Sequence, residues 1–329
     1  MGTRRYSIRE AGKRMKSKMQ QTMERQPDDL RRLHTDTGRI EDLAALLKGR
    51  RVYVIGTGTS WHAASQGASF LRKAEVDAWA IPSADFYLDG PAAGPNDAVV
   101  AMTHTGAKRY TSQALKQARS DGAVTVMISG LGVEGADLET VPREKSAAYT
   151  ASHLGALFRM AQLAQALGAD LGDLGAVPDA VATAMAEGPM SVGVPDRLME
   201  FIGGGINQWT AAEAALKVRE TAYVATEGLG IEQFLHGPSV ALRRTDTLVC
   251  FDGGGPWTQR IAEIAEAAEQ SGVYVKRISA PGNGEPLSIF PLTVAAQRIA
   301  LELAEKLGTD PDTFGREIPG REPWAGIPL

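Results

Sequence analysis

Two short polar segments follow apolar, strand-like runs in the first half of the chain. Gly56-Thr-Gly-Thr-Ser60 follows residues 51–55, and Thr103-His-Thr-Gly106 follows residues 97–102. In open parallel sheets, ligands bind beyond the carboxyl ends of the strands, and helix amino termini there offer N–H groups and a positive dipole end to a phosphate. Threonine and serine hydroxyls add further donors. The pattern predicts an anion site, most simply for a phosphate group, formed by Thr57, Gly58, Thr59, Ser60, Thr103, His104, Thr105, Gly106 and Lys108.

Two other interpretations of these turns stay open at this point. Gly56-Thr-Gly58 begins the Gly-x-Gly pattern of a dinucleotide site, but Trp61 occupies the place of the third glycine, where a helix must approach closely. The turns could also be ordinary polar loop tips, an interpretation that explains one such turn more easily than two.

A second group of chemically useful residues lies in the second half. Glu213, Lys217 and Glu220 are spaced i, i+4 and i+7, so they share one face of a helix. In isolation this spacing indicates a solvated stripe with an ordinary Glu–Lys pair. His236, in a loop broken by glycine, adds an imidazole. A base, a cation and an imidazole that converge on a phosphate site would suit proton transfer on a phosphorylated ligand.

The elements around these residues predict an α/β fold. Strand-like runs at 51–55, 76–81, 97–102 and 124–128 alternate with helix-like segments at 61–73 and 109–120. This alternation is typical of a mostly parallel sheet with helices on both faces. Ahead of it, residues 7–48 have helical spacing with a break at Gln26-Pro27.

The second half repeats this plan. Residues 246–279 can be laid beside 97–129 as strand, turn, helix, glycine and strand, and residues 197–206 correspond to the first strand and turn. We therefore predict two tandem doubly wound, flavodoxin-like domains. The expected boundaries are an N-terminal helical segment at 1–48, a first domain at 49–190, a second at 191–312 and a tail at 313–329.

Composition narrows the classes of protein. The formal net charge of −4 gives no general attraction to nucleic acid or an anionic membrane, although residues 4–18 are strongly basic. The single cysteine, Cys250, lies in an apolar run and is expected to be a small buried residue. No apolar run approaches a membrane span and no apolar segment follows the charged amino terminus, so we expect a cytoplasmic protein.

The motifs together resemble sugar-isomerase (SIS) domains, and most closely the isomerase half of glucosamine-6-phosphate synthase. Gly-Thr-Gly-Thr-Ser-Trp-His-Ala-Ala64 and Thr-His-Thr-Gly106 resemble that family's two substrate turns. The most specific segment is Ala212-Glu-Ala-Ala-Leu-Lys-Val-Arg-Glu-Thr-Ala-Tyr223 with Glu232-Gln-Phe-Leu-His-Gly-Pro238. The resemblance runs from Met19 to about Asp312.

The resemblance implies roles for individual residues. Glu220 would move a proton between C1 and C2, Lys217 would steady the developing enediolate, and His236 would assist ring opening, reaching in from the other subunit of a homodimer. Thr150 matches a family position that contacts the sugar, and His104 matches one that often does. His62 is expected to be packed rather than catalytic, and His34 and His153 carry no motif. The histidines are scattered, with no His/Cys/Asp cluster at metal-ligand spacing, so we expect no metal and no other cofactor.

Three departures from the family pattern bear on function. The chain shows no glutaminase segment with a nucleophilic cysteine, so we expect it not to release ammonia from glutamine by itself. The synthase's carboxyl-terminal lysine has no counterpart, since the last lysine is Lys306. Ala107 and Lys108 replace an acidic residue and a threonine after the second turn, and Lys108 brings a full charge toward the anion.

Two functions follow as hypotheses. The first is a phosphosugar enzyme, an aldose–ketose isomerase or an amino-sugar-phosphate isomerase or deaminase, that acts through an enediolate with Glu220 as base. The alternative is a sensor that binds a sugar phosphate without converting it. A sensor has no need for Glu220 and His236 beside the ligand, and their motif context favours the enzyme.

Overall fold

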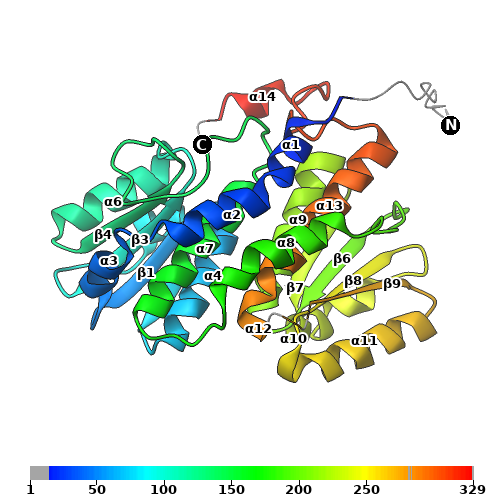
Figure 1. Ribbon diagram of the computed structural model, residues 1–329. Helices are drawn as coiled ribbons and strands as arrows, with labels where there is room; N and C mark the ends of the chain where they lie inside the picture. The colour runs from blue at the N-terminus through cyan, green and yellow to red at the C-terminus, as the bar shows by residue number, and fades with distance from the viewer. Residues whose placement is uncertain (1–14, 281, 283, 328–329) are drawn as a thin grey trace.

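The computed structural model describes residues 15–280, 282 and 284–327. Two parallel sheets lie side by side with helices on both faces of each (Figure 1). The first sheet has the strand order β2-β1-β3-β4-β5 and the second β7-β6-β8-β9. Most of the predicted basic segment at 4–18 lies outside the described residues.

The strands and helices of the first half match the predicted alternation. Its strands are β1 (Arg51–Gly56), β2 (Ala78–Pro82), β3 (Asp97–Thr103), β4 (Val124–Ser129) and β5 (Leu138–Glu139). Its helices are α1 (Lys18–Glu24), α2 (Gln26–Thr35), α3 (Ile40–Leu47), α4 (Thr59–Lys73), α5 (Ser83–Asp89), α6 (Arg109–Ser120), α7 (Ala151–Ala166) and α8 (Val177–Ala186).

The second half has the same order for its four strands as β1 to β4 have in the first sheet. Its strands are β6 (Met199–Gly203), β7 (Thr226–Gly230), β8 (Thr247–Asp252) and β9 (Tyr274–Ser279). Its helices are α9 (Gln208–Ala222), α10 (Ile231–Leu235), α11 (Thr258–Gln270), α12 (Gly284–Leu287), α13 (Ile289–Leu307) and α14 (Glu322–Ala325).

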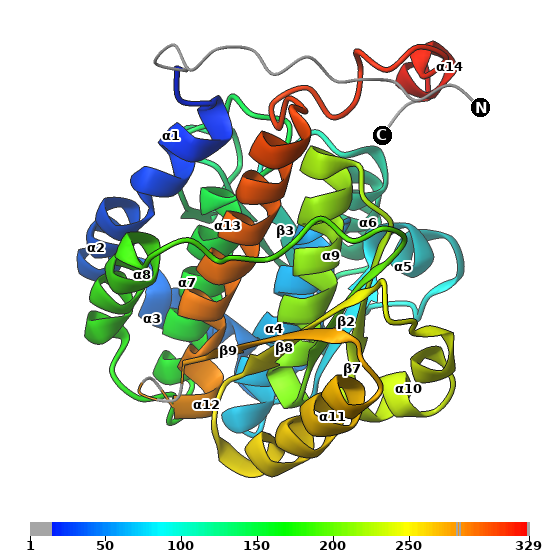
Figure 2. The ribbon, with the colours of Figure 1, turned by 90° about the vertical axis from the view of Figure 1, so that its right-hand side faces the viewer.

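The helices between the two sheets determine how the halves meet. On the first sheet α3, α4 and α7 cover one face, and α5 and α6 cover the other. On the second sheet α9 and α13 cover one face, and α10 and α11 the other. Figure 1 shows α4, α7, α9 and α13 between the two sheets, and Figure 2 shows α9 and α13 from the side of the second half. Phe290 and Val294 of α13 join the same apolar cluster as Phe158 of α7. The two halves therefore share buried apolar surface, which favours a fixed relative orientation.

The structure corrects the expectation that no apolar run approaches the length of a membrane span, because α12 and α13 together form such a run. Together they form a 24-residue segment that is long and apolar enough to span a membrane by length and composition. However, 89% of its most apolar window is buried inside the protein. Its apolar character is explained by packing between the two halves.

Cys250 lies on β8 and is buried and free, as predicted. Burial raises the pKa of its thiol to about 12. A thiol of this kind is chemically inert at neutral pH.

A buried glutamate on the second sheet predicts a pH-dependent stability. Glu200 on β6 is 1% exposed and lies opposite Glu227 on β7. Burial, followed by the nearby charges of Glu227 and Asp246, raises the pKa of Glu200 to about 7, despite the opposing charge of Arg197. The folded protein therefore keeps this proton up to about pH 7, whereas the unfolded chain releases it near its ordinary pKa of 4.5.

As the pH rises from about 4.5 to 7, the unfolded state gains the advantage of ionisation and the free energy of unfolding falls, by up to about 3 kcal/mol. Urea unfolding of the protein across this pH range should show that decline, and Glu200→Gln should flatten it. An unchanged slope in the variant would show that Glu200 is not its source.

Candidate functional site

The predicted polar turns and the predicted helical face line one cavity of about 440 Å³. The ends of β1 and β3 form one wall, and α9 from the second half forms another. Predicted residues in the lining are Thr57, Gly58, Thr59, Ser60, Thr103, His104, Thr105, Lys108, Lys217 and Glu220. The other lining residues are Ala84, Met102, Arg109, Tyr110, Thr111, Ala147, Tyr149 and Phe314.

The first turn has a backbone that only glycine allows. A Cβ on Gly56 would lie 2.3 Å from the carbonyl oxygen of Ser60, and Gly58 has a φ of 57° in the region that glycine favours. The turn leads directly into α4, whose amino terminus has no side-chain cap, and α6, with Lys108 at its N-cap position, likewise has none. Two helix amino termini thus lie beside the cavity with N–H groups suited to an anion.

The charged face of α9 is buried, which excludes the interpretation as a solvated stripe. The side chains of Glu213 and Lys217 are 0% and 1% exposed, and that of Glu220 is 11% exposed. Lys217 pairs with Glu220, and its Nζ lies 3.5 Å from Oε1 of Glu213. A buried charge is tolerated only with partners of this kind.

Glu213 connects the two halves of the protein at the cavity. Thr59 donates its hydroxyl hydrogen to Oε1 of Glu213 at 3.1 Å, and Nδ1 of His62 lies 2.7 Å from Oε2. Thr59 and His62 belong to α4, whereas Glu213 belongs to α9. The carboxylate therefore holds the turn at residues 56–60 against the helix that carries Lys217 and Glu220. His62 is packed, as predicted.

The three charged groups on α9 affect one another's protonation. Burial alone would raise the pKa of Glu213, but Lys217, His153 and His62 hold it at about 2. Burial opposes the charge of Lys217, but the two carboxylates outweigh it and raise the lysine pKa. For Glu220, burial dominates and raises the pKa although Lys217 acts in the opposite direction. The site thus contains a stable Glu213–Lys217 ion pair and a second carboxyl that holds its proton more firmly than an exposed glutamate.

The second turn contains a neutral imidazole. The backbone N–H of Glu144 donates to Nε2 of His104 at 3.0 Å, so the ring's hydrogen is on Nδ1. Burial lowers the pKa of His104, which keeps the ring uncharged at neutral pH. Its ring meets Tyr149 edge to face at a centroid distance of 4.9 Å.

Three predicted residues do not line this cavity. Thr150 is fully buried and donates both its N–H and its hydroxyl hydrogen to Glu144, at the start of α7. Gly106 shapes the turn with a φ of 69°. His236 is exposed at the end of α10, where its Nδ1 lies 2.6 Å from the carbonyl oxygen of Glu232. Its predicted entry into a neighbouring subunit's site stays a prediction.

Sequence reasoning missed several residues of the cavity and its surroundings. Tyr149, not Thr150, is the member of that motif that reaches the cavity, and Phe314 comes from the tail segment. Glu213 was placed on the right helical face but not assigned to the site. His153 of α7 lies beneath the first turn, with Nδ1 3.3 Å from the carbonyl oxygen of Thr59. No local sequence signal separates these residues from ordinary core positions.

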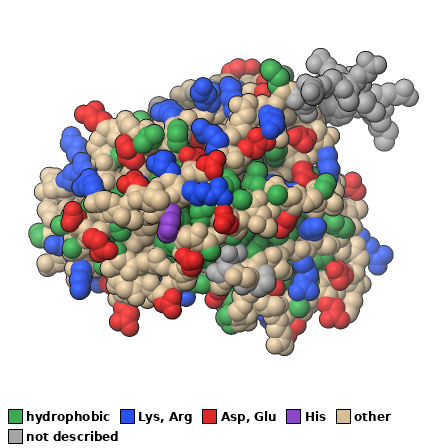
Figure 3. All heavy atoms as spheres, in the orientation of Figure 1, with side chains coloured by type: hydrophobic (Ala, Val, Ile, Leu, Met, Phe, Trp, Pro, Cys, Tyr) green, Lys and Arg blue, Asp and Glu red, His purple; other side chains and the backbone are tan. Residues whose placement is uncertain are grey.

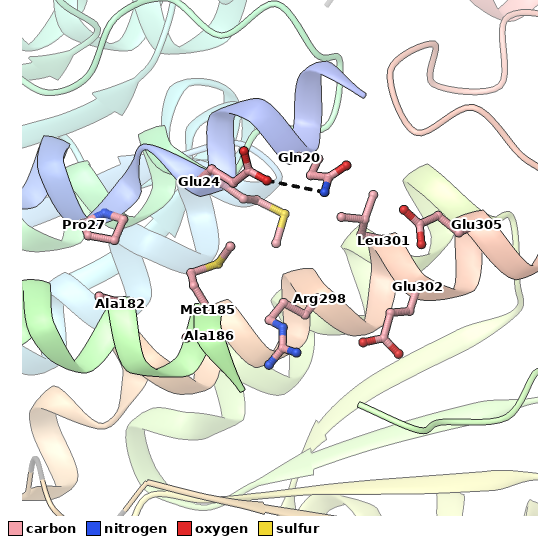
Figure 4. Close-up of a pocket in the computed structure, with 11 residues that line it drawn as sticks. Gln20, Glu24, Pro27, Ala182, Met185, Ala186, Arg298, Leu301, Glu302 and Glu305 are labelled. Atoms are coloured by element: carbon pink, nitrogen blue, oxygen red, sulfur yellow. Dashed lines mark hydrogen bonds between the residues drawn. The ribbon is translucent and has the colours of Figure 1, made fainter. Parts of the chain in front are cut away.

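A second cavity of about 490 Å³ lies between α1, α2, α8 and α13 (Figure 4). Its charged lining includes Glu24, Glu302 and Glu305, which repel an anion. Arg298 also lines it, but its guanidinium donates to the carbonyl oxygens of Ala184, Glu187 and Gly188. On the face in Figure 3, basic and acidic side chains are interspersed. The 440 Å³ cavity is therefore the better candidate for an anionic ligand.

Comparison with known proteins finds relatives in sequence and in fold. Residues 45–134 match the family model of the SIS domain. The isomerising glutamine–fructose-6-phosphate aminotransferase of Thermococcus kodakarensis is 26% identical over 302 residues, which cover 80% of this chain and 50% of the relative. The chain thus spans about half the length of this relative.

Solved structures resemble the fold as a whole. Tagatose-6-phosphate ketose/aldose isomerase from Escherichia coli has a TM-score of 0.78 at 18% identity, covering 93% of this chain and 98% of that one. Glucosamine-6-phosphate deaminase from Thermotoga maritima has a TM-score of 0.75 at 17% identity, covering 91% and 98%. These likenesses establish a common α/β architecture of two parallel sheets. Residues 45–134 are thus similar to the SIS domain, and most of the chain is similar in sequence to about half of the isomerising glutamine–fructose-6-phosphate aminotransferases.

Proposed function

We propose that this protein is a phosphosugar enzyme, an aldose–ketose isomerase or an amino-sugar-phosphate isomerase or deaminase, that works through an enediolate. One observation carries the proposal: Glu220, a buried carboxyl with a raised pKa, lines the same cavity as two hydroxyl-rich turns at helix amino termini. The phosphate would bind to the turns at Thr57–Ser60 and Thr103–Thr105 and to Lys108. The sugar carbons would then extend toward α9.

Proton transfer between C1 and C2 is assigned to Glu220. A general base works best when its pKa is close to the working pH, and burial moves the pKa of Glu220 in that direction. Lys217 touches this carboxyl and is held in its charged form by Glu213. A fixed positive charge at this place would stabilise negative charge that develops on the substrate oxygens.

Lys306, the last lysine in the sequence, lies on α13, donates to the carbonyl oxygen of Val192 and does not line the cavity. The proposal covers isomerisation and reactions that gain or lose an amine at C1 or C2. A homodimer in which His236 completes the neighbouring site is part of the same proposal.

Lys108→Ala tests whether Lys108 binds the phosphate group of the substrate. Loss of a charge-assisted contact should weaken the binding of hexose 6-phosphates and amino-hexose 6-phosphates about tenfold, and leave the binding of the unphosphorylated sugars unchanged. The measurement is a ligand-dependent thermal shift, since ligands that bind the folded state raise the melting temperature, followed by calorimetric titration of the sugars that respond.

The matched control is Lys116→Ala, which removes an exposed lysine from α6, the helix that follows Lys108. It should bind both kinds of sugar as the unmodified protein does. An equal loss for phosphorylated and neutral sugars in Lys108→Ala would mean that Lys108 does not bind the phosphate. No stabilisation by any phosphorylated sugar would contradict the proposed function itself.

A further inference from the structure

A small, partly open chamber adjoins the 440 Å³ cavity. Its volume is about 20 Å³, and it is lined by the start of α4, the ends of β3 and β4, and the first turns of α7. Thr59, Ser60, Thr103, His104 and Tyr149 line both spaces. His153 lines only the chamber.

Three of the lining residues have a buried polar atom without a hydrogen-bond partner among the described residues. These atoms are Oγ1 of Thr103, Nδ1 of His104 and Nε2 of His153, and the residues are 4%, 7% and 2% exposed. A buried polar atom left without a partner costs about 1–3 kcal/mol. Three such atoms on residues that line one chamber indicate a ligand that satisfies them.

The hydrogen positions on both rings follow from their other contacts. Nε2 of His104 accepts the N–H of Glu144, so its Nδ1 carries hydrogen and is a donor. Nδ1 of His153 faces the carbonyl oxygen of Thr59, which can only accept, so Nδ1 donates and Nε2 is a bare acceptor. The hydroxyl of Thr103 can do either. The chamber therefore offers one N–H donor, one nitrogen acceptor and one hydroxyl.

The size of the chamber selects the ligand. About 10–15 Å³ of such space is enough for a water molecule, which needs two to four polar partners. The space is far too small for a phosphate or a sugar. We propose that the chamber binds one buried water molecule, which donates to His153, accepts from His104 and contacts the hydroxyl of Thr103.

This water has a consequence for the anion site, which rests on the proposed function. If its second hydrogen points to Oγ1 of Thr103, that oxygen accepts one hydrogen bond inside the chamber. The hydroxyl hydrogen of Thr103 is then left to donate to an anion in the cavity, which Thr103 also lines. His153 would thus act as a positioning residue that favours an anion at Thr103 through the water.

The test uses the full chain labelled with ¹⁵N in its histidines and measured without sugar. NMR should show His153 as a neutral ring with hydrogen on Nδ1 and a hydrogen-bonded Nε2, together with cross-relaxation between its Hε1 and a long-lived water. His153→Phe should abolish the water signal and weaken the binding of inorganic phosphate about tenfold. His34→Phe, a change of the same kind at an exposed histidine outside the chamber, should do neither.

Thr103→Val provides a second variant that keeps the size of the side chain and both histidines, and it should shorten the residence time of the same water. The proposal is overturned if the unmodified protein shows a His153 Nε2 without a hydrogen bond or lacks the long-lived water. A water that is present while phosphate binding is equal in His153→Phe and the unmodified protein would refute the positioning role. Because the water is measured without sugar, its presence does not depend on the proposed reaction.

Discussion

Glu220→Gln should lower the rate of C2-proton exchange in a bound sugar phosphate by a factor of about 10² to 10⁴, which is the usual contribution of a positioned general base. An amide has nearly the same shape as the carboxyl but cannot take up the proton. Lys217 keeps its other partner, Glu213, in this variant. The affinity for the sugar phosphate should therefore change little.

The measurement is incorporation of deuterium from heavy water at C2, followed by NMR, with hexose and amino-hexose 6-phosphates at saturating concentration. Affinity is determined separately by calorimetry. Glu232→Gln is a suitable control because Glu232 is an exposed partner of Arg260, and it should exchange at the normal rate. Equal losses of binding and exchange in Glu220→Gln would contradict the assignment of a base. Binding without any exchange in the unmodified protein would favour the sensor.

Glu213→Leu should destabilise the folded protein by about 3–5 kcal/mol, because removal of one member of a buried ion pair leaves the other charge poorly compensated. Lys217 is 1% exposed and would retain only Glu220. Thr59 and His62 would lose their common acceptor as well. The free energy of unfolding in urea measures this effect.

A double-mutant cycle separates the ion pair from simple loss of packing. Lys217→Met removes the second charge, and Glu213→Leu/Lys217→Met should be more stable than the sum of the two single changes predicts, by about 1–3 kcal/mol. Glu232→Gln, at a surface pair in which both side chains are nearly half exposed, should cost less than about 1 kcal/mol. Additive losses in the cycle would show that Glu213 and Lys217 do not depend on each other.

The alternation of strands and helices was determined locally and could be predicted. The apolar, β-branched run at 51–55 became β1, the run at 97–102 became β3, and the turns after both face the cavity. The underlying reason is that a buried parallel strand needs a continuous apolar run. Parallel strands also bring their carboxyl ends to one edge of the sheet, so the polar turns had to lie close together.

The sequence alone could not predict which way the side chain of Thr150 points or where the apolar segment α12–α13 lies. Thr150 and Tyr149 are neighbours, and the direction of each side chain depends on how α7 begins, where Glu144 binds Thr150. For α12–α13, length and composition are compatible with a membrane span. Only the packing of the two halves around it shows that this segment is a core helix.

What the sequence by itself determined is the content of the site: two hydroxyl-rich turns after parallel strands, and a helix with Glu213, Lys217 and Glu220 on one face. Only the tertiary structure decided what that face does. The same spacing fits a solvated stripe, and the charges are buried here because α4 of the first half packs on α9 of the second. The pKa of each group depends on its burial and its partners, which are contributed by residues about 150 positions away in the sequence and have no local signature.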